Sequence, residues 1–566
     1  MKCGMAALAS CHSTRLFAQA PQSPQKKPNI LYLFSDEHRY FSMSFSQMPQ
    51  IDTPNMKRMA REGICFDQCI SNLPVCVPHR GILMSGLWPE KSTYLDNEYV
   101  GNRENMGGNF PALGDTFKAA GYRTAYIGKW HLGRTTTHQT GFDHFIDWIG
   151  TDNHWAGSYR DGNIEGSETT DSTGYNATVM SDQAIDWLNR NAGQKEPFFM
   201  MVSWNPPHWR MDDAPPELME KYEKGLPSRP NAPQKGKIND DKIFTGYHAH
   251  IEAIDKELGR MLEHLESLGV LEDTIVIYTS DHGSAFGENG MHSKPHPFEE
   301  TIRVPFLARW PRHIPAGKRT DALLGAINIY PTLCALAGIP IPEHCSGHEL
   351  SHLFLDQSGP EPDAQFLAMY CNSKNYYGNV LEPGSDKGQY PFRGIRTKTH
   401  TFAVKADGDW VLYDNQKDPY QMNNLVDDPA HKALKEKMRK KLDQLLARAE
   451  DPFIPEEWTR LPLPERIQTM NQYYILSRSA GRLEKLRSRA LQPYLEQNPS
   501  QSQKMELQKA TEEVYDLDFF GQYISLGQNR SKKPEFRKRF SELNQRQDEK
   551  FRKQAEEIMR HKAGSK

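Results

Sequence analysis

Short apolar runs that end in polar or charged residues recur along the first two thirds of the chain. Four such runs are typical of buried strands, at residues 29–34, 124–127, 198–203 and 274–279. Helical segments at residues 115–120 and 251–268 precede two of these runs, and a glycine follows each segment. Buried strands that alternate with helices predict an α/β fold with a large doubly wound, mostly parallel sheet flanked by helices.

Charged and polar side chains follow each of these predicted strands. In strand order they are Asp36 and Glu37, Lys129 and His131, His208, and Asp281 with His282. Ligands of open parallel sheets bind outside the carboxyl ends of the strands. We therefore predict that these side chains converge on one crevice, although they are spread over about 250 residues of chain.

The pattern changes beyond about residue 393. Residues 401–404 and 410–413 form short alternating segments that predict strands, and apolar residues follow at helical spacing from Leu434 to Leu445. These features predict a smaller C-terminal antiparallel-sheet-plus-helix subdomain, followed by a helical tail. The predicted organisation is a leader at 1–27, a catalytic domain at 28–390, the subdomain at 391–452 and a polar, helical extension at 453–566.

The composition is that of a globular chain with a polar surface. Of 566 residues, 37% are hydrophobic and 25% are charged, and the mean hydropathy is -0.73. The net charge of -3 excludes a protein built chiefly to neutralise nucleic acid, and no apolar run approaches the roughly 20 residues of a transmembrane segment. Residues 531–566 carry 12 Lys and Arg against 6 Asp and Glu. This basic tail indicates a site for an anionic polymer or, as we favour, a solvated helix packed on the body.

The N-terminal segment has features of an export signal. Lys2 precedes an apolar stretch at residues 5–9, and Ala18-Gln19-Ala20 has the small-x-small form of a cleavage site. Leu8-Ala9-Ser10-Cys11 instead fits a lipidation box, and these two interpretations exclude each other. We expect an exported protein that is periplasmic, on the cell surface or secreted; a disordered tail is the alternative. Eight cysteines are too few for a disulfide scaffold.

The segment from Cys76 to Gly86 is the most informative part of the sequence. Pro78 suits the first turn of a helix that runs towards Gly86, which places Cys76 at the helix N-terminus. Backbone N–H groups and the helix dipole favour an anion there. On this ground alone, Cys76 is either a thiolate nucleophile or a small buried residue.

The spacing of Cys76, Pro78 and Arg80 resembles the C-x-P-x-R signature of the type I sulfatases, members of the alkaline phosphatase-like superfamily. In that family the cysteine is oxidised to formylglycine (3-oxoalanine). Further matches in the family's order extend the resemblance over roughly residues 28–450. They are Asn29–Asp36, Thr53–Asn55, Gly128–Gly133, Pro207-His208, Ser280–Gly283, Lys294, Arg303–Pro305, Leu412–Asp414 and Asp418–Leu425. The combined pattern is highly specific, whereas each short match alone is not.

The resemblance implies a nucleophile made from Cys76. A formyl group hydrates to a geminal diol, in which one hydroxyl attacks sulfur and the other later expels sulfate, a step that serine could not perform. By analogy, Arg80 and Lys129 hold the diol and lower its pKa, and His131 takes the proton that drives the expulsion. His208 and Lys294 would bind sulfate oxygens, and one of them would protonate the leaving alcohol.

The resemblance also implies one bound Ca²⁺ ion. Its ligands would be Asp36, Glu37, Asp281, His282 and the residue made from Cys76. Carboxylate oxygens prefer a hard ion such as calcium. Three carboxylates balance Arg80, Lys129 and Lys294, so a divalent ion is needed to attract a sulfate ester and would act on it as a Lewis acid.

Two residues depart from the family's pattern. Glu37 stands where many relatives have Asp, so it either ligates differently or faces solvent, and we favour ligation. His79 stands where serine is common, which bears on how a maturation enzyme recognises Cys76. Cysteine, proline and arginine, the core of the signature, are intact.

The predicted function is sulfate ester hydrolysis by a sulfuric ester hydrolase. Several side chains predict platforms or contacts for sugar rings, although core packing explains half of the aromatic ones equally well. They are Trp148, His154, Trp155, Tyr159, Arg160, Trp204 and Trp209. We therefore expect a sulfated polysaccharide or its oligosaccharides as the substrate. The expected partner is a formylglycine-generating or anaerobic sulfatase-maturing enzyme.

Three alternatives stay open on the sequence. The substrate is an aryl sulfate in the first. In the second, a similar fold hydrolyses phosphonate monoesters or phosphodiesters. In the third, the protein is a glycan-binding protein with a degenerate site, against which the intact Cys76, Arg80, Lys129 and Asp281 argue.

Overall fold

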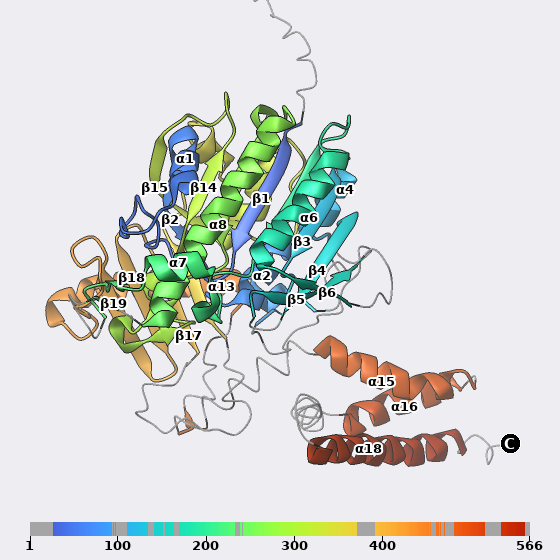
Figure 1. Cartoon of the computed structure of the whole chain (residues 1–566). Coiled ribbons are helices and arrows are strands. Elements are labelled where there is room, and N and C mark those ends of the chain that lie inside the picture. Colours follow the sequence, from blue (N-terminus) through green and yellow to red (C-terminus); the bar gives the residue numbers. More distant parts are fainter. Residues whose placement is uncertain are drawn as a thin grey trace, which may run out of the picture.

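One large sheet organises the first two thirds of the chain (Figure 1). The computed structural model describes most of residues 27–560. Outside it lie residues 1–26, 98–109, 134–140, 163–168, 233–237, 371–390, 454–459, 470–479, 516–533 and 561–566, with one to three residues at several other points. The leader predicted at 1–27 therefore lies almost wholly outside the described residues.

Eleven strands of the described chain form this sheet, in the order β13-β2-β14-β10-β1-β7-β3-β4-β5-β6, and β15 pairs with β2. The strands are β1 (Asn29–Ser35), β2 (Ile64–Ile70), β3 (Arg123–Gly128), β4 (His144–Ile149), β5 (Ala156–Asp161), β6 (Thr169–Thr173), β7 (Phe198–Ser203), β10 (Thr274–Ser280), β13 (Arg303–Val304), β14 (Phe306–Arg309) and β15 (Lys318–Gly325). From β10 through β1, β7 and β3 to β4, neighbouring strands run parallel. Beyond β10 and β4 the strands join antiparallel, except β15, which runs parallel to β2. The predicted mostly parallel α/β sheet is confirmed.

Helices cover both faces of the sheet because successive side chains of a strand point to opposite sides. Leu31 and Leu33 of β1 pack in a core with α1, α6 and α8, whereas Ile30, Tyr32 and Phe34 pack in a second core with α2, α4 and α10. These helices are α1 (Pro54–Glu62), α2 (Cys76–Ser85), α4 (Leu113–Ala119), α6 (Asn176–Asn191), α8 (Lys242–Ser267) and α10 (Ala326–Leu336). The remaining short helices are α3 (Pro89–Ser92), α7 (Pro216–Lys221), α9 (Glu299–Ile302) and α11 (Ser351–Phe354).

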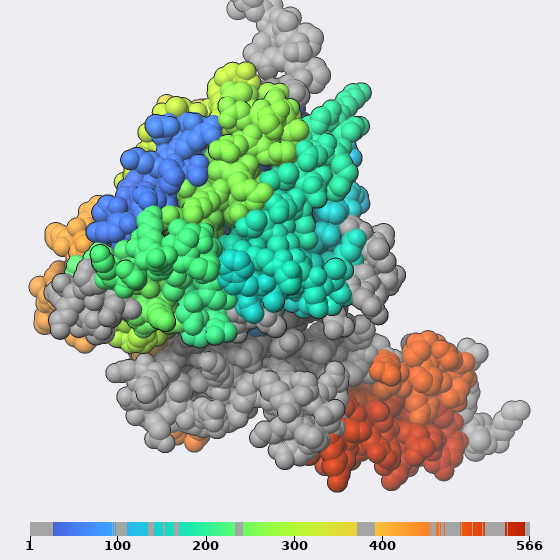
Figure 2. Space-filling view, viewed as in Figure 1, coloured from blue at the N-terminus to red at the C-terminus, as the bar shows by residue number. Residues whose placement is uncertain are grey.

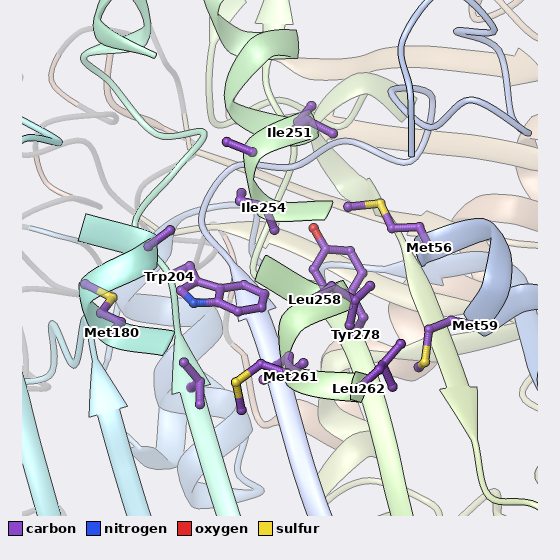
Figure 3. Close-up of a cluster of buried hydrophobic side chains, with 14 of the residues drawn as sticks. Met56, Met59, Met180, Trp204, Ile251, Ile254, Leu258, Met261, Leu262 and Tyr278 are labelled. Atoms are coloured by element: carbon purple, nitrogen blue, oxygen red, sulfur yellow. The ribbon is translucent and has the colours of Figure 1, made fainter. Parts of the chain in front are cut away.

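The first core is closed by side chains of three helices. Figure 3 shows Met56 of α1, Met180 of α6 and Leu258 of α8 around Trp204 and Tyr278, all of them buried. Figure 2 shows α1, α8 and α6 side by side over this face of the molecule. The parallel strands are thus held between two apolar layers, so their carboxyl ends are rigid supports for a site.

A smaller antiparallel sheet follows the large one. It consists of β16 (Gln365–Met369), β17 (Phe392–Arg396), β18 (His400–Lys405) and β19 (Gly408–Asp414), and α13 (Lys432–Ala449) packs on it. The predicted subdomain is confirmed as a sheet with a helix. Strand β16 precedes the boundary predicted at residue 391, and its pairing partner follows the undescribed residues 371–390.

The described residues of the tail include three long helices that pack on one another, α15 (Ala480–Leu495), α16 (Gln501–Val514) and α18 (Pro534–Arg560). Leu507, Leu543 and Phe551 are buried among them, and the bundle is visible in Figure 1. The predicted helical tail is confirmed. Among the described helices, none combines the length and the apolar character needed to cross a bilayer. The five described cysteines, at positions 65, 69, 76, 334 and 345, are free thiols.

Candidate active site

The register of β1 and β10 places two acidic residues side by side. Ser35 pairs with Ser280 at the last position of both strands, so Asp36 and Asp281 leave the sheet together. The backbone N–H of Glu37 donates to Oδ1 of Asp281 at 3.0 Å. Both aspartates are fully buried, so their charges need partners or a cation.

The loops after β3 and β7 bring basic side chains to the same edge of the sheet. Nζ of Lys129 lies 2.7 Å from Oδ2 of Asp36. His131 lies beside Cys76, with which it makes a side-chain hydrogen bond. Nε2 of His208 lies 3.7 Å from Oε2 of Glu37. The polar residues that follow the four strands thus meet at one place, as their positions in the sequence predict.

Helix α2 contributes Cys76 from its first residue and Arg80 one turn later. Cys76 is fully buried, with Sγ 3.6 Å from Oδ1 of Asp36 and 3.2 Å from Nε2 of His282. Arg80 donates to Oδ2 of Asp36 at 3.0 Å and to Oδ2 of Asp281 at 3.0 and 3.1 Å. The guanidinium therefore joins the nucleophile's helix to both acidic strand ends.

Lys294 enters from the loop that follows the hairpin of β11 (Ala285–Phe286) and β12 (His292–Ser293). Its Nζ lies 2.9 Å from Oε2 of Glu37, 3.2 Å from Sγ of Cys76 and 3.2 Å from Nε2 of His282. Glu37 is only 2% exposed, so its side chain lies inside the site and does not face solvent.

The charges around Cys76 control its protonation. Burial alone would raise the pKa of the Cys76 thiol, but the charges of Lys294 and Lys129 lower this pKa well below its ordinary value. Burial lowers the pKa of His131 to about 4, against the opposing effect of its hydrogen bond to Cys76. A neutral imidazole beside position 76 is the form that accepts a proton.

The site also fits a hard divalent cation. One ligand atom each from Asp36, Cys76, Asp281 and His282 lie within 4.8 Å of one another, and Asp36, Glu37 and His208 form an overlapping group. Nε2 of His282 is 3.8 Å from Oδ1 of Asp36 and 3.6 Å from Oδ1 of Asp281. Ligands of one Ca²⁺ ion, each at about 2.3–2.6 Å from it, have separations of this size.

Hydroxyl groups that the sequence analysis missed support these residues. Ser203 accepts a hydrogen bond from Nη1 of Arg80 at 2.8 Å. Ser71 donates to the carbonyl of Asp281 at 2.6 Å, and its Oγ lies 2.9 Å from Nδ1 of His79. His79, which stands where serine is common in the family's signature, is thus buried beside Ser71, which in turn contacts Asp281 at the end of β10. No sequence motif marks Ser71 or Ser203, because single serines are common and only the fold gives them partners.

The aromatic residues proposed as sugar platforms divide into two groups. Trp148, Tyr159 and Trp204 are buried and belong to the core, and His154 is fully buried, so these four do not serve as exposed sugar platforms. Trp155 and Trp209 are 39% and 48% exposed, and Trp209 directly follows His208. The second pair is therefore accessible from solvent, and the indole N–H of Trp155 donates to the carbonyl of Asp213.

The fold and the site fit a class of protein: hydrolases of anionic esters whose reactive side chain and candidate cation ligands lie at the carboxyl edge of a parallel sheet. Comparison with known proteins gives the family. The family model for sulfatases matches residues 28–339, and the model for the C-terminal part of N-sulphoglucosamine sulphohydrolase matches residues 287–448. The chain belongs to the sulfatase family and is a sulfuric ester hydrolase.

Individual relatives cover most of the chain. The ulvan-active sulfatase of Formosa agariphila is 31% identical over 444 residues, which cover 76% of this chain and 83% of that protein. The N-acetylglucosamine-6-O-sulfatase of Bacteroides thetaiotaomicron is 28% identical, with coverage of 79% and 89%. The crystal structure of the putative sulfatase yidJ from Bacteroides fragilis superimposes with a TM-score of 0.66 at 27% identity, covering 80% of this chain and 99% of that one.

Proposed function

We propose that this sulfatase removes sulfate from a sulfated polysaccharide or its oligosaccharides, using a formylglycine made from Cys76 and one Ca²⁺ ion. The observation that carries the proposal is the position of Cys76, whose Sγ lies 3.6 Å from Oδ1 of Asp36 and 3.2 Å from Nζ of Lys294. Two similar proteins act on sulfated carbohydrates according to their names, an ulvan-active sulfatase and an N-acetylglucosamine-6-O-sulfatase. This similarity supports a carbohydrate as the leaving group.

Side chains around position 76 would position and activate the nucleophile. The hydrated aldehyde of formylglycine supplies one oxygen that attacks sulfur and a second that later expels sulfate. Arg80 and Lys129 stabilise negative charge there, because both are held by Asp36 at distances of 3.0 and 2.7 Å. His131, neutral at pH 7, accepts the proton whose removal drives the expulsion.

His208 is the better placed of the two candidates for protonating the leaving alcohol. Nδ1 of His208 lies 2.8 Å from the carbonyl of Trp209, which orients Nε2 towards Glu37 and the site. The side chain is 20% exposed, so the alcohol can leave towards solvent past it. Lys294 differs. Burial would lower the pKa of its ammonium group, but the negative charges of Cys76 and Glu37 outweigh burial and raise this pKa above the ordinary range. Lys294 therefore stays charged and binds sulfate oxygens.

Asp36, Glu37, Asp281 and His282 would hold the Ca²⁺ ion, with the modified residue 76. A divalent cation there would polarise a sulfate oxygen. Chelation should therefore abolish activity, and Ca²⁺ should restore it to the same preparation; activity that is indifferent to chelation would contradict the metal assignment.

The proposal also includes a maturing enzyme and an exported location. Oxidation of Cys76 needs a formylglycine-generating or anaerobic sulfatase-maturing enzyme. Residues 1–27 would direct export to the periplasm, the cell surface or the medium. The mass of the peptide that contains position 76 tests the first point, and fractionation of the producing cell tests the second.

The decisive experiment is a substrate panel with protein co-expressed with a maturing enzyme. Defined sulfated oligosaccharides, an aryl sulfate, a phosphodiester and a phosphonate monoester are compared on one preparation by released anion. We expect the highest kcat/KM for a sulfated oligosaccharide and no release by Cys76→Ala. Preference for the phosphorus esters, or unchanged sulfate release by the variant, would overturn the proposal.

A further inference from the structure

A second group of metal-type side chains lies outside the site around Cys76. It consists of His154 before β5, Asp213 in η1 (Met211–Asp213) and His250 in α8. Nδ1 of His154 lies 2.6 Å from Oδ1 of Asp213, and Nε2 of His250 lies 3.3 Å from the same oxygen. The three ligand atoms are within 4.8 Å of one another, and both histidines are fully buried. The chain thus brings three separate segments to one point.

Each member of this group is held by an outer partner. The hydroxyl of Tyr175 lies 2.7 Å from Nδ1 of His250, and the side-chain amide of Asn205 lies 3.1 Å from Nε2 of His154. The backbone N–H of His154 donates to Oδ2 of Asp213 at 3.0 Å. Histidines that bind metals usually hold their second ring nitrogen in this way, and ligating carboxylates are likewise hydrogen-bonded.

Two buried polar atoms of the group lack hydrogen-bond partners among the described residues. They are Nε2 of His250, which faces Asp213 without hydrogen-bond geometry, and Oδ1 of Asn205. Buried polar atoms are normally satisfied, so such atoms need an explanation. A cation would bind Nε2 of His250. Once Nδ1 of His154 also binds it, Nε2–H of His154 donates to Oδ1 of Asn205, with the amide rotated.

We propose that His154, Asp213 and His250 bind one Zn²⁺ ion. Two imidazoles with one carboxylate suit zinc, whereas the carboxylate-rich set around Cys76 suits calcium. The ion takes the place of the proton between Nδ1 of His154 and Oδ1 of Asp213, that proton moves to Nε2 of His154, and a water molecule takes the fourth position. Nδ1 of His154 and Oδ1 of Asp213 then move from hydrogen-bond distance to about 3.3 Å, the separation of tetrahedral ligands at about 2.0–2.1 Å.

The ion would position the loop that carries His208. It joins the segment before β5, η1 and α8, and through Asn205 it reaches the loop after β7. His208 and Trp209 are the third and fourth residues beyond Asn205. The zinc ion thus acts through the placement of these two side chains, without contact to the substrate. This consequence for catalysis rests on the proposed function, whereas the binding of zinc does not.

Zinc binding is tested on the full-length protein, stripped with a chelator, saturated with Ca²⁺ and then titrated with Zn²⁺. Wild type and Asp281→Asn, which alters the site around Cys76 and none of the three proposed zinc ligands, should each bind one equivalent. His250→Gln and Asp213→Asn should bind zinc more than about 100-fold more weakly, and Asn205→Ala about 10–100-fold more weakly. His313→Gln, outside the group, is the matched histidine control. Equal zinc binding by His250→Gln and wild type, or none by wild type, would overturn the proposal.

X-ray absorption at the zinc edge gives a readout that needs no variant. The wild-type spectrum should fit two imidazole nitrogens and light-atom ligands at about 2.0–2.2 Å; sulfur ligation or a shell of oxygen alone would refute the assignment. With turnover established, zinc removal should raise KM, because His208 and Trp209 are no longer held in place. Sulfate release that fails on every substrate would reject the proposed function and leave the zinc result standing.

Discussion

The thiol of Cys76 is buried among three cations and three carboxylates. This arrangement stabilises a reactive thiolate and is unlike the apolar surroundings of a structural cysteine. Lys294 and Lys129 lower the pKa of Cys76, and Arg80 fixes the aspartates on its other side. A merely structural cysteine has a raised pKa in apolar surroundings, as Cys69 has because of burial. The two cysteines differ in their neighbours, and only Cys76 has charged ones that its sequence motif predicts.

Replacement of Cys76 separates the two steps of the proposed reaction. Cys76→Ala should lose sulfate release by about 10⁶-fold, the order of loss on removal of a catalytic nucleophile. Cys76→Ser keeps one hydroxyl but lacks the second, so it should release the alcohol once per protein molecule and keep the sulfate. Mass spectrometry of the intact variant after exposure to substrate would detect this adduct. Multiple turnovers by Cys76→Ser would contradict the mechanism.

Individual site residues could be predicted from the sequence where they follow a recognisable spacing. Cys76, Pro78 and Arg80 form a motif, and the strand-end residues follow apolar runs, so both groups were predictable. Lys294 was assigned through family resemblance, because no periodic pattern places it beside Glu37. His154, Asp213 and His250 were missed as a group, since tertiary contacts alone bring them together.

Among the elements, the parallel strands were predictable and the edge strands were not. Strands β1, β7 and β10 are buried on both faces and are therefore continuous apolar runs. Strand β5 is mostly half-buried and β6 is largely exposed, with sequences AGSYRD and TTDST, so their pairing follows from the neighbouring strand and leaves no hydrophobic signature. The antiparallel edge formed by β5 and β6 could not be predicted for this reason.

Gly128 is the last residue of β3 and precedes Lys129. Its substitution tests how closely the end of this strand controls the site. Its φ is 114°, and a Cβ there would lie 2.2 Å from the carbonyl oxygen of Ser203, which accepts a hydrogen bond from the N–H of Lys129. Gly128→Ala should therefore displace Lys129, lower kcat by at least about tenfold, and destabilise the fold by more than the roughly 1–2 kcal/mol of left-handed strain alone. Steady-state kinetics and urea unfolding measure both effects.

Gly121 is the matched control for this substitution. Its φ is also positive, at 83°, but a Cβ there meets no described atom within 4 Å. Gly121→Ala should show the backbone strain without the change in kcat. Equal kinetic losses in the two variants would mean that the close contact with Ser203 does not hold the site.

Glu90, a buried residue of α3, should make the stability of the fold depend on pH. Burial, and next the charge of Asp451, raise the pKa of Glu90 well above its ordinary value, and Tyr370 donates a hydrogen bond to it. The folded state therefore keeps a proton that the unfolded state loses above about pH 4.5. Between that pH and the raised pKa, stability should fall by up to about 1.4 kcal/mol per pH unit.

Glu90→Gln removes this titration while keeping an oxygen that accepts from Tyr370. The stability of the variant relative to wild type should rise steadily between pH 5 and 7, measured by urea unfolding at several pH values. Glu272→Gln, which makes the same carboxyl-to-amide change at a side chain that is 58% exposed, is the matched control. A parallel curve for Glu90→Gln would show that Glu90 is ionised in the folded protein.

For the whole molecule, we predict that the C-terminal helices α15, α16 and α18 are not needed for catalysis. The family models end at residue 448, whereas Arg393 of the small sheet pairs with Asp451 and stacks on Phe453 at 4.7 Å. A chain that ends at Arg460 keeps these contacts and lacks α15, α16 and α18. We expect it to keep kcat/KM on short substrates within about threefold of the full chain.

A chain that ends at Glu450 should behave differently. It removes the carboxylate of Asp451 from the buried guanidinium of Arg393, a loss that typically costs about 3–5 kcal/mol. Thermal unfolding of the two truncated chains, compared with the full chain, measures the difference. Equal stability of both would show that the Arg393–Asp451 pair is dispensable.

The complete burial of Cys76 also sets the order of events during biosynthesis. In the finished fold, α2 and the ends of β1 and β10 enclose the thiol, and no large catalyst can reach it. Any enzyme that converts Cys76 must therefore meet the polypeptide while this segment is still extended, before the partner strand ending at Ser280 has been added to the sheet. If position 76 is oxidised as proposed, oxidation competes with folding in time, so slower synthesis or delayed folding should raise the fraction of active molecules.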